Sequence, residues 1–333
     1  MILNLEQVRA IARGVAYVEE TDGVFFFHRF TKSQEQAYLD GGNAGFCKRL
    51  SSTAGVRLAF VTDSSKFSFR YALKMAGSRP YGAFDVYENG ILIKHFGFES
   101  GEWTCEGSQS VALSQGTKTV ELYLPWSFGA ALSEITLDDG AMLEGFSRKY
   151  TMISFGDSIT QGVDVVHPSL AYAPTLARLM DADSRNKGIG GEVFFPALLE
   201  EKEDLDPDFV TVAYGSNDWS KCTYDVLKEN ARAFYQRVSA LYPNARIFGI
   251  TPVYRLDGKG KGMIGAPCWE VDAVIREVCA DLPNVTVITG WNMVPATREF
   301  FSDFRVHPND MGAMVYAQNL YASIAKELMK SKN

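Results

Sequence analysis

The chain of 333 residues has few cysteines and no long apolar run. An odd number of cysteines, with no pair at Cys-x-x-Cys spacing, indicates reduced thiols rather than a disulfide framework. No stretch approaches the roughly 18 apolar residues of a transmembrane helix. The first residues also lack the basic and apolar regions of a signal peptide. We therefore expect a cytoplasmic protein without membrane partners. The five cysteines are Cys47, Cys105, Cys222, Cys268 and Cys279.

An excess of positive charge and the common cofactor motifs are also missing. The chain has 33 Lys and Arg against 40 Asp and Glu, and a net charge of −7, which argues against nucleic acid as the main partner. No His-Glu-x-x-His and no Cys/His cluster offers a metal site. Gly258–Gly262 lacks the phosphate-binding pattern of a P-loop, and Val193 stands where a dinucleotide site needs its third glycine. We expect no metal and no cofactor, and we interpret Gly258–Gly262 as a mobile loop or lid beside the functional site.

Residues 1–146 have the pattern of an all-β fold. Side chains alternate over Val56–Val61 and Lys66–Tyr71, as in strands with one buried face. Two further apolar segments are joined by Glu88-Asn89-Gly90, and Asn-Gly between apolar strands is a strong hairpin signal. Short strands at this spacing predict a β-sandwich of the jelly-roll type.

From residue 147 the pattern changes to strands that alternate with helices. Such alternation predicts a parallel sheet with helices on both faces, and ligands bind such sheets at the carboxyl ends of the strands. We therefore predict an accessory β-sandwich domain over 1–146 and an α/β domain that carries the functional site over 147–333. The expected strands lie at 150–155, 208–214, 245–251 and 284–289, and the expected helices near 170–181, 193–203, 223–241, 267–281 and after Pro308.

One hydroxyl group follows the first of these strands. The apolar run breaks at Gly156-Asp157-Ser158, ahead of a helical segment, which places Ser158 on a sharp turn. Gly-Asp-Ser is a common turn sequence, but this is also where an α/β enzyme holds a nucleophile. A serine hydroxyl attacks an ester only when a base removes its proton.

Four histidines could supply that base. His28 and His95 lie in the β-rich half and are interpreted as structural or surface residues. His167 lies in a loop that could line a pocket. His307 precedes Pro308 in a loop from which a side chain can reach another strand end. We therefore select His307 as the base.

Two other loops could donate hydrogen bonds to an oxyanion. The glycines of Gly188–Glu192 allow the backbone to approach a ligand closely, and the Asn217 amide in Gly215–Trp219 donates without a change of charge. Either loop could also be an ordinary turn. Trp219 could pack on a sugar ring or an acetyl methyl group, or form a plain wall. Trp126 is expected in core or interface packing, although it could project toward the cleft.

Together these residues resemble the SGNH (GDSL-type) hydrolase superfamily. Its four sequence blocks match Ser158, Gly191 with Asn186 ahead of it, Asn217 and His307, in the same order. The resemblance covers roughly residues 150–330. It implies a flavodoxin-like α/β/α domain with a serine nucleophile, a histidine base, and an oxyanion hole from Ser158, Gly191 and Asn217. A β-sandwich ahead of such a domain is similar to the two-domain esterases that remove acetyl groups from sugars.

One block departs from the family pattern. The family places an aspartate three residues before the histidine, where this chain has Phe304. Asp303, four residues before His307, could still reach its Nδ1 atom and fix its tautomer. Alternatively, a backbone carbonyl orients His307 in a Ser-His dyad.

The resemblance implies a serine esterase that hydrolyses acetyl or other short-chain esters, on a small molecule or an oligosaccharide. One alternative is a lipase, thioesterase or acyltransferase that acts on longer acyl groups. A second is a catalytically silent carbohydrate-binding protein. The sequence predicts neither the sugar nor the oligomeric state.

Overall fold

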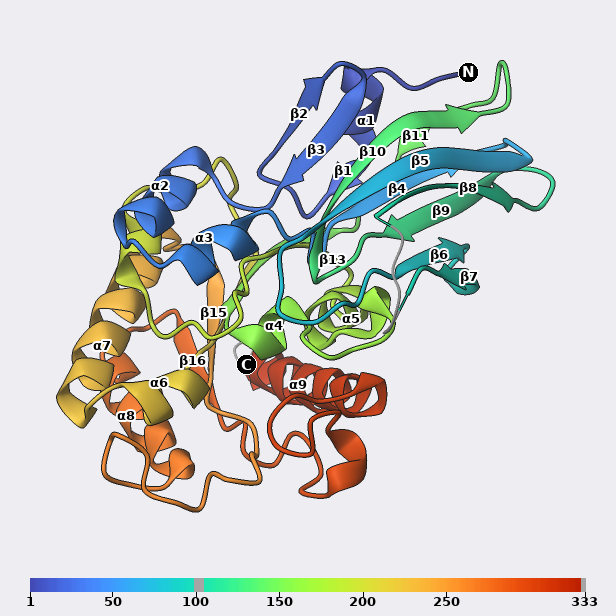
Figure 1. Ribbon diagram of the computed structural model, residues 1–333. Helices are drawn as coiled ribbons and strands as arrows, with labels where there is room; N and C mark the ends of the chain where they lie inside the picture. Colours follow the sequence, from blue (N-terminus) through green and yellow to red (C-terminus); the bar gives the residue numbers. More distant parts are fainter. Residues whose placement is uncertain (99–104, 331–333) are drawn as a thin grey trace.

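The computed structural model describes residues 1–98 and 105–330. In the described part of the first half, two antiparallel sheets pack against each other (Figure 1). The strand order is β1-β4-β9-β6-β7 in the first sheet, where β11 also pairs with β4, and β2-β3-β10-β5-β8 in the second. The first sheet contains β1 (Ala12–Arg13), β4 (Arg57–Thr62), β6 (Phe84–Glu88), β7 (Ile91–Phe96), β9 (Lys118–Tyr123) and β11 (Glu144–Gly145). The second contains β2 (Tyr17–Thr21), β3 (Val24–His28), β5 (Lys66–Met75), β8 (Glu106–Ala112) and β10 (Phe128–Leu137).

Alternation along the strands creates the core of this half. Phe60, Phe84 and Leu122 of the first sheet are buried against Phe67 and Phe69 of the second. In an extended strand successive side chains point to opposite faces, so every second residue enters the space between the sheets. The predicted β-sandwich is confirmed.

The predicted hairpin is also present. β6 and β7 pair antiparallel, and the turn residues Asn89 and Gly90 have φ of +50° and +79°. Two consecutive positive φ angles suit the right-handed twist of a tight hairpin, and Asn-Gly adopts them at little cost.

The second half contains a parallel sheet of five strands within the described residues, in the order β13-β12-β14-β15-β16. This order is that of a flavodoxin-like doubly wound sheet, so the predicted fold class is confirmed. The four strands that were expected from apolar runs are all present. The strands are β12 (Tyr150–Gly156), β13 (Ala182–Asn186), β14 (Phe209–Ala213), β15 (Arg246–Ile250) and β16 (Val285–Ile288).

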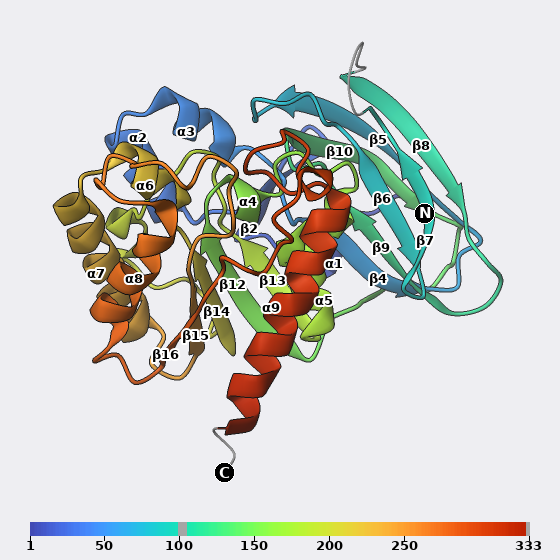
Figure 2. The same ribbon diagram turned by 90° about the horizontal axis from the view of Figure 1, so that it is seen from below.

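Helices cover both faces of this sheet (Figure 2). Ile153 and Val210 pack with α7 (Tyr224–Leu241) and α8 (Val271–Cys279). Their neighbours along the strands face the other way: Met152 and Phe209 pack with α5 (Tyr172–Leu179) and α9 (Asp310–Lys330). Strands buried on both faces explain the nearly continuous apolar runs. The remaining helices of this half are α4 (Ser158–Gln161) and α6 (Ser216–Lys221).

One predicted helix is wrong. The segment 193–203 contains only a 3₁₀ turn, Pro196–Leu199. Pro196 has no N–H group and restricts the residue before it, so an α-helix cannot run through this point. The chain crosses here as an irregular segment toward β14.

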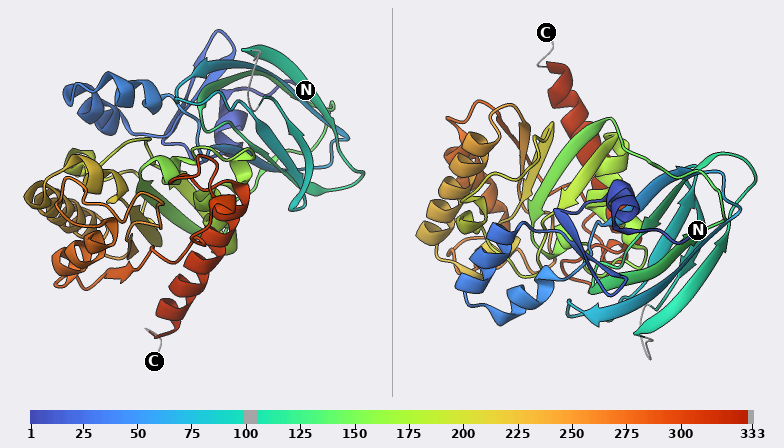
Figure 3. Two further views of the ribbon diagram at one scale, coloured as in Figure 1. Left: turned by 60° about the horizontal axis from the view of Figure 1, so that its bottom comes forward. Right: turned by 90° about the horizontal axis from the view of Figure 1, so that it is seen from above.

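The first half also contains three helices that strand alternation does not predict: α1 (Leu5–Ile11), α2 (Lys32–Asp40) and α3 (Ala44–Leu50). A capping box between Thr31 and Gln34 begins α2. Tyr38 of α2 belongs to the same hydrophobic cluster as Ile153 of the parallel sheet. Figure 3 shows α2 and α3 against the second half. The domain division at 146/147 stays a prediction, although residues of the first half complete the core of the second.

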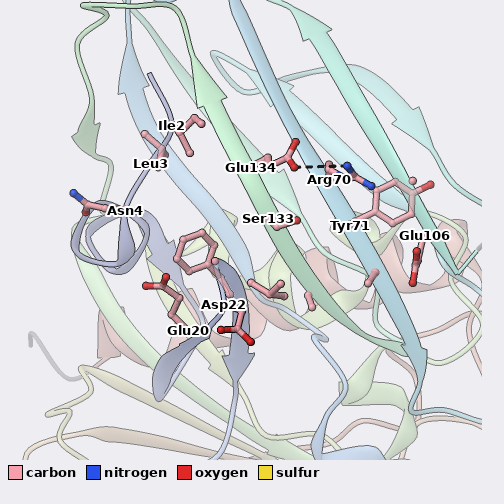
Figure 4. A pocket seen from close by; sticks show the side chains of 16 residues that line it. Ile2, Leu3, Asn4, Glu20, Asp22, Arg70, Tyr71, Glu106, Ser133 and Glu134 are labelled. Atoms are coloured by element: carbon pink, nitrogen blue, oxygen red, sulfur yellow. Dashed lines mark ion pairs between the residues drawn. The ribbon is translucent and has the colours of Figure 1, made fainter.

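The outer face of the second sheet carries a groove of about 650 Å³. Its polar side chains include Glu20, Arg70 and Glu106, and Arg70 forms an ion pair with Glu134 at 3.6 Å (Figure 4). Neither Ser158 nor His307 lines this groove. Within residues 1–98 and 105–330, no helix is long and apolar enough to cross a membrane.

Candidate active site

The structure brings Ser158 and His307 together across 149 positions of sequence. β12 ends at Gly156, and Ser158 is the first residue of α4, at the carboxyl edge of the parallel sheet. His307 lies in the loop that leads into α9. Its Nε2 atom is 2.9 Å from Ser158 Oγ, which is the distance at which a base can accept the hydroxyl proton.

Asp303 lies next to His307. Its Oδ2 atom is 2.7 Å from His307 Nδ1. Its other oxygen, Oδ1, accepts hydrogen bonds from the backbone N–H groups of Arg305, Val306 and His307 at 2.8–3.1 Å. Burial alone would raise the pKa of Asp303, but the bonds from His307 and the backbone hold it well below its usual range. Asp303 is therefore an ionised carboxylate fixed by its own loop.

The extra residue of this loop is Phe304. Its φ is +52° and its side chain is 63% exposed. An antiparallel bridge between Phe301 and Pro308 closes the loop. The loop accommodates the additional position with a left-handed, exposed Phe304, and Asp303 still contacts His307.

A second carboxylate stands close to the same histidine and was missed in the sequence. Asp164 is 5% exposed, and its Oδ2 atom lies 3.6 Å from His307 Nδ1. Arg79, from the β-sandwich half, donates to Asp164 at 2.7 Å. No local pattern marks this pair, because its two members are 85 positions apart.

The other three histidines have different partners. His28 contacts Glu35 at 3.0 Å, and His95 contacts Asp85 at 2.7 Å. His167 contacts Asp310 at 2.8 Å, and its ring lies 4.1 Å from that of His95. In the part of the chain that the structure describes, two groups of acidic and histidine side chains have ligand atoms close enough together to hold a metal ion. They are Asp85, His95 and His167, and Asp164, Asp303 and His307.

Three hydrogen-bond donors are predicted to form the oxyanion hole: the N–H groups of Ser158 and Gly191 and the Asn217 amide. The N–H group of Ser158 lies at the start of α4, where helical amides have no partner within the helix. Gly191 has a φ of +86°, which favours glycine and exposes its backbone. Within the described residues, neither N–H group has a protein acceptor. The third donor, Asn217 Nδ2, bonds Glu192 O at 3.0 Å and Asp157 Oδ2 at a longer 3.3 Å.

Neither Trp219 nor Trp126 presents an open ring face on which a sugar could stack. Trp219 is 6% exposed, its indole N–H donates to Ala266 O at 2.8 Å, and the Arg255 guanidinium lies 4.5 Å from its ring. Its contact with substrate stays a prediction. Trp126 is buried and donates to Val165 O at 2.9 Å, so it packs between the two halves. Gly262 of the glycine-rich loop lies directly against Trp219.

Residues of the first half form hydrogen bonds with the backbone of the Gly191 loop. Arg29 is fully buried, and its guanidinium donates to Asn186 O at 2.7 Å and Gly188 O at 3.1 Å. Gln161 Oε1 accepts from Gly190 N at 2.7 Å, while its amide donates to Trp126 O at 3.2 Å. The position of the Gly191 loop therefore depends on contacts with the β-sandwich half.

Glu192 is a buried acid beside this loop. Tyr214 donates to Glu192 Oε2 at 2.9 Å, and Tyr38 of α2 donates to Oε1. Burial raises the pKa of Glu192 from 4.5 to about 8, because desolvation disfavours the charged form. Protonation of this group therefore couples to folding.

We expect stability to fall as the pH rises from about 4.5 to about 8, and to fall less in Glu192→Gln. A raised folded-state pKa contributes stability that is complete below the unfolded pKa and is lost as the pH approaches the folded one. Within that window the wild type should lose up to ~1.4 kcal/mol per pH unit relative to the variant. Denaturant unfolding of both proteins across this range measures the difference, with the exposed Glu201→Gln as control. Parallel stability curves for wild type and Glu192→Gln contradict the expectation.

Comparisons with known proteins agree with this architecture. A salicylyl-acyltransferase from a tetracycline biosynthetic pathway is 24% identical, with a TM-score of 0.81 over 95% of this chain and 94% of its own. A candidate GDSL-like lipase from Bacteroides ovatus is 19% identical, with a TM-score of 0.74 over 97% of both chains. An acetyl xylan esterase from the rumen bacterium Butyrivibrio proteoclasticus is 14% identical, with a TM-score of 0.64 over 98% of both chains. No curated protein matches the sequence.

The fold is that of an SGNH domain preceded by a β-sandwich. Residues 154–315 match the model of the GDSL-like Lipase/Acylhydrolase family. The second half of the chain is therefore a GDSL-type lipase/acylhydrolase domain, and the resemblance found in the sequence is confirmed.

Proposed function

We propose that the protein is a serine esterase that hydrolyses short-chain esters, above all acetyl esters, on carbohydrates through an acyl-serine intermediate. The observation that carries the proposal is the continuous set of contacts from Ser158 Oγ to His307 Nε2 and from His307 Nδ1 to Asp303, at 2.9 and 2.7 Å. This arrangement can activate a hydroxyl group and hold the resulting imidazolium.

The proposed reaction has two halves. His307 Nε2 takes the Ser158 proton as Oγ attacks the acyl carbonyl, and Asp303 stabilises the imidazolium. The oxyanion accepts hydrogen bonds from the N–H groups of Ser158 and Gly191 and from Asn217 Nδ2. The C–O bond breaks, and His307 gives its proton to the departing alcohol. Water then attacks the acyl-serine carbonyl as His307 takes its proton. The acyl–Oγ bond breaks, His307 returns the proton to Ser158 Oγ, and the acid is released.

We expect Asn217→Ala to lower kcat by ~10²–10³-fold while KM changes little, because its amide is needed when charge develops on the carbonyl oxygen. Steady-state kinetics on p-nitrophenyl acetate measure the effect. Asn319→Ala, on the exposed face of α9, is the matched control. A loss below about threefold, or one confined to KM, removes Asn217 from the proposed oxyanion hole.

An acyltransferase or longer-chain acylhydrolase on the same residues is the second candidate. The likeness to a salicylyl-acyltransferase over 95% of the chain favours it, since an alcohol could replace water in the second half-reaction. The carbohydrate substrate is supported by the likeness to an acetyl xylan esterase. A cytoplasmic location stays a prediction, under which imported oligosaccharides are the expected substrates.

Acetate release from acetylated xylan, mannan and their oligosaccharides tests the proposal, together with p-nitrophenyl esters of increasing chain length. The proposal expects the highest kcat/KM with acetyl and other short acyl groups. The second candidate is favoured instead if kcat/KM is highest for acyl chains of eight carbons or more. It is also favoured if acyl transfer to an added alcohol is faster than hydrolysis.

A further inference from the structure

Two positively charged side chains flank the Gly191 loop. Arg49 lies at the end of α3, and its Nε atom is 3.4 Å from the position that a Cβ atom on Gly190 would occupy. Lys221 ends α6, and its Nζ atom is at the same 3.4 Å distance from the corresponding position on Gly191. Because Gly190 and Gly191 are adjacent, the two cations stand on neighbouring residues of the proposed oxyanion loop.

Within the described residues, the hydrogen bonds of both cations go to backbone carbonyl groups. Lys221 Nζ donates to Gly191 O at 2.5 Å, and Arg49 donates from one terminal nitrogen to Gly45 O at 2.8 Å. Among residues 1–98 and 105–330, no carboxylate forms an ion pair with either side chain. Burial lowers the pKa of the half-buried Arg49, and no neighbouring acid opposes that effect.

Other arginines near the site are paired. Arg79 binds Asp164 and Arg255 binds Asp257, each at 2.7 Å. The charge of Lys221 does reach the buried Asp157, but that carboxylate already accepts from Ile159 N and Asn217 Nδ2. Among the described residues, the half-buried Arg49 and the exposed Lys221 thus form no ion pair with a carboxylate, and a bound anion could pair with both.

We propose that the ester accepted at Ser158 carries an anionic group, such as a carboxylate, which binds between Arg49 and Lys221. This inference rests on the proposed esterase function and narrows its substrate class. The guanidinium can hold a carboxylate through two N–H groups, and the ammonium adds a point charge. The negative group can belong to the alcohol, as in an acetylated sugar acid, or to the acyl part, as in a hemiester of a dicarboxylic acid.

Two matched pairs of esters test the proposal and separate these sources. The first pair is an acetylated methyl glucuronoside and its carboxyl methyl ester. The second is the hemisuccinate and the methyl succinate of one neutral alcohol. The readout is the ratio of kcat/KM for the charged ester to that for the neutral ester within each pair. This ratio cancels general damage to the site.

The wild type should prefer the charged member of one pair by ~10-fold or more, and the preference should weaken with salt. Arg49→Gln and Lys221→Gln should each lower the ratio by ~3-fold, and the double variant should bring it close to one. Arg49→Lys keeps the charge without the planar fork and should retain part of the preference. Lys202→Gln, a distant lysine paired with Asp206, should leave the ratio as in wild type.

If the enzyme cleaves the neutral esters and shows no preference for the charged member of either pair, the anion site is wrong. The esterase proposal is then unaffected. The same conclusion follows if a preference exists but neither substitution changes it. If no member of either pair is cleaved, the esterase proposal fails and the anion site fails with it.

Discussion

Replacement of Ser158 by alanine is expected to lower kcat for ester hydrolysis by ~10⁴–10⁶-fold. The hydroxyl is the group that His307 contacts at 2.9 Å, and alanine leaves nothing to attack the carbonyl. Because Ser158 is the first residue of a short helix and only part-buried, the fold should be retained. Initial rates on p-nitrophenyl acetate, with unfolding curves for both proteins, measure the effect.

Ser110→Ala is the matched control, since Ser110 is exposed on β8 of the sandwich. A correctly folded Ser158→Ala protein with more than about a tenth of the wild-type rate excludes Ser158 as nucleophile. Activity would then have to come from a different site.

Replacement of Asp303 by asparagine is expected to lower kcat by ~10²–10⁴-fold. Three backbone N–H groups bind Oδ1, so an asparagine must keep its oxygen there and turn its NH₂ group toward His307 Nδ1. That nitrogen then becomes the acceptor, and the proton moves to Nε2, which can no longer take the Ser158 proton. The loop thus fixes the wrong tautomer.

The pH–rate profile and the comparison with Asp164→Asn distinguish this cause from loop damage. Asp164→Asn leaves the 2.7 Å contact of Asp303 intact and should lose less activity than Asp303→Asn. A rate within twofold of wild type for Asp303→Asn leaves only the Ser-His dyad. A larger loss in Asp164→Asn makes that carboxylate the orienting group.

Residues of the first half hold loops of the proposed active site in position. Arg29 holds the carbonyl groups of Asn186 and Gly188, and Gln161 joins Gly190 to the backbone at Trp126. Arg79 reaches Asp164 beside His307. The positions of the Gly191 loop and of the side chains around His307 therefore depend on contacts with residues before position 147.

Local patterns made much of the site predictable. The turn after an apolar strand located Ser158, and the glycine-rich and Asn-containing loops located Gly191 and Asn217 at neighbouring strand ends. Those positions follow from the rule that the carboxyl ends of parallel strands share one edge. Their catalytic roles stay predictions, whereas the spatial proximity of Ser158 and His307 is observed.

Other features depend on contacts between distant segments. Asp164 and Arg79 form a pair that no spacing rule connects. The position of Asp303 depends on the left-handed conformation of Phe304, which a phenylalanine adopts only when the surrounding loop requires it. The capping box of Thr31 and Gln34 was a usable signal for α2, and Pro196 was a usable signal against the helix predicted at 193–203.

The most direct test of the nucleophile is to treat the protein with a fluorophosphonate and locate the adduct by peptide mass spectrometry. One adduct on Ser158 is expected, formed at a rate that falls at least ~10²-fold in His307→Ala. An adduct at another residue, or none in a protein that still hydrolyses esters, contradicts an acyl-serine mechanism at this site.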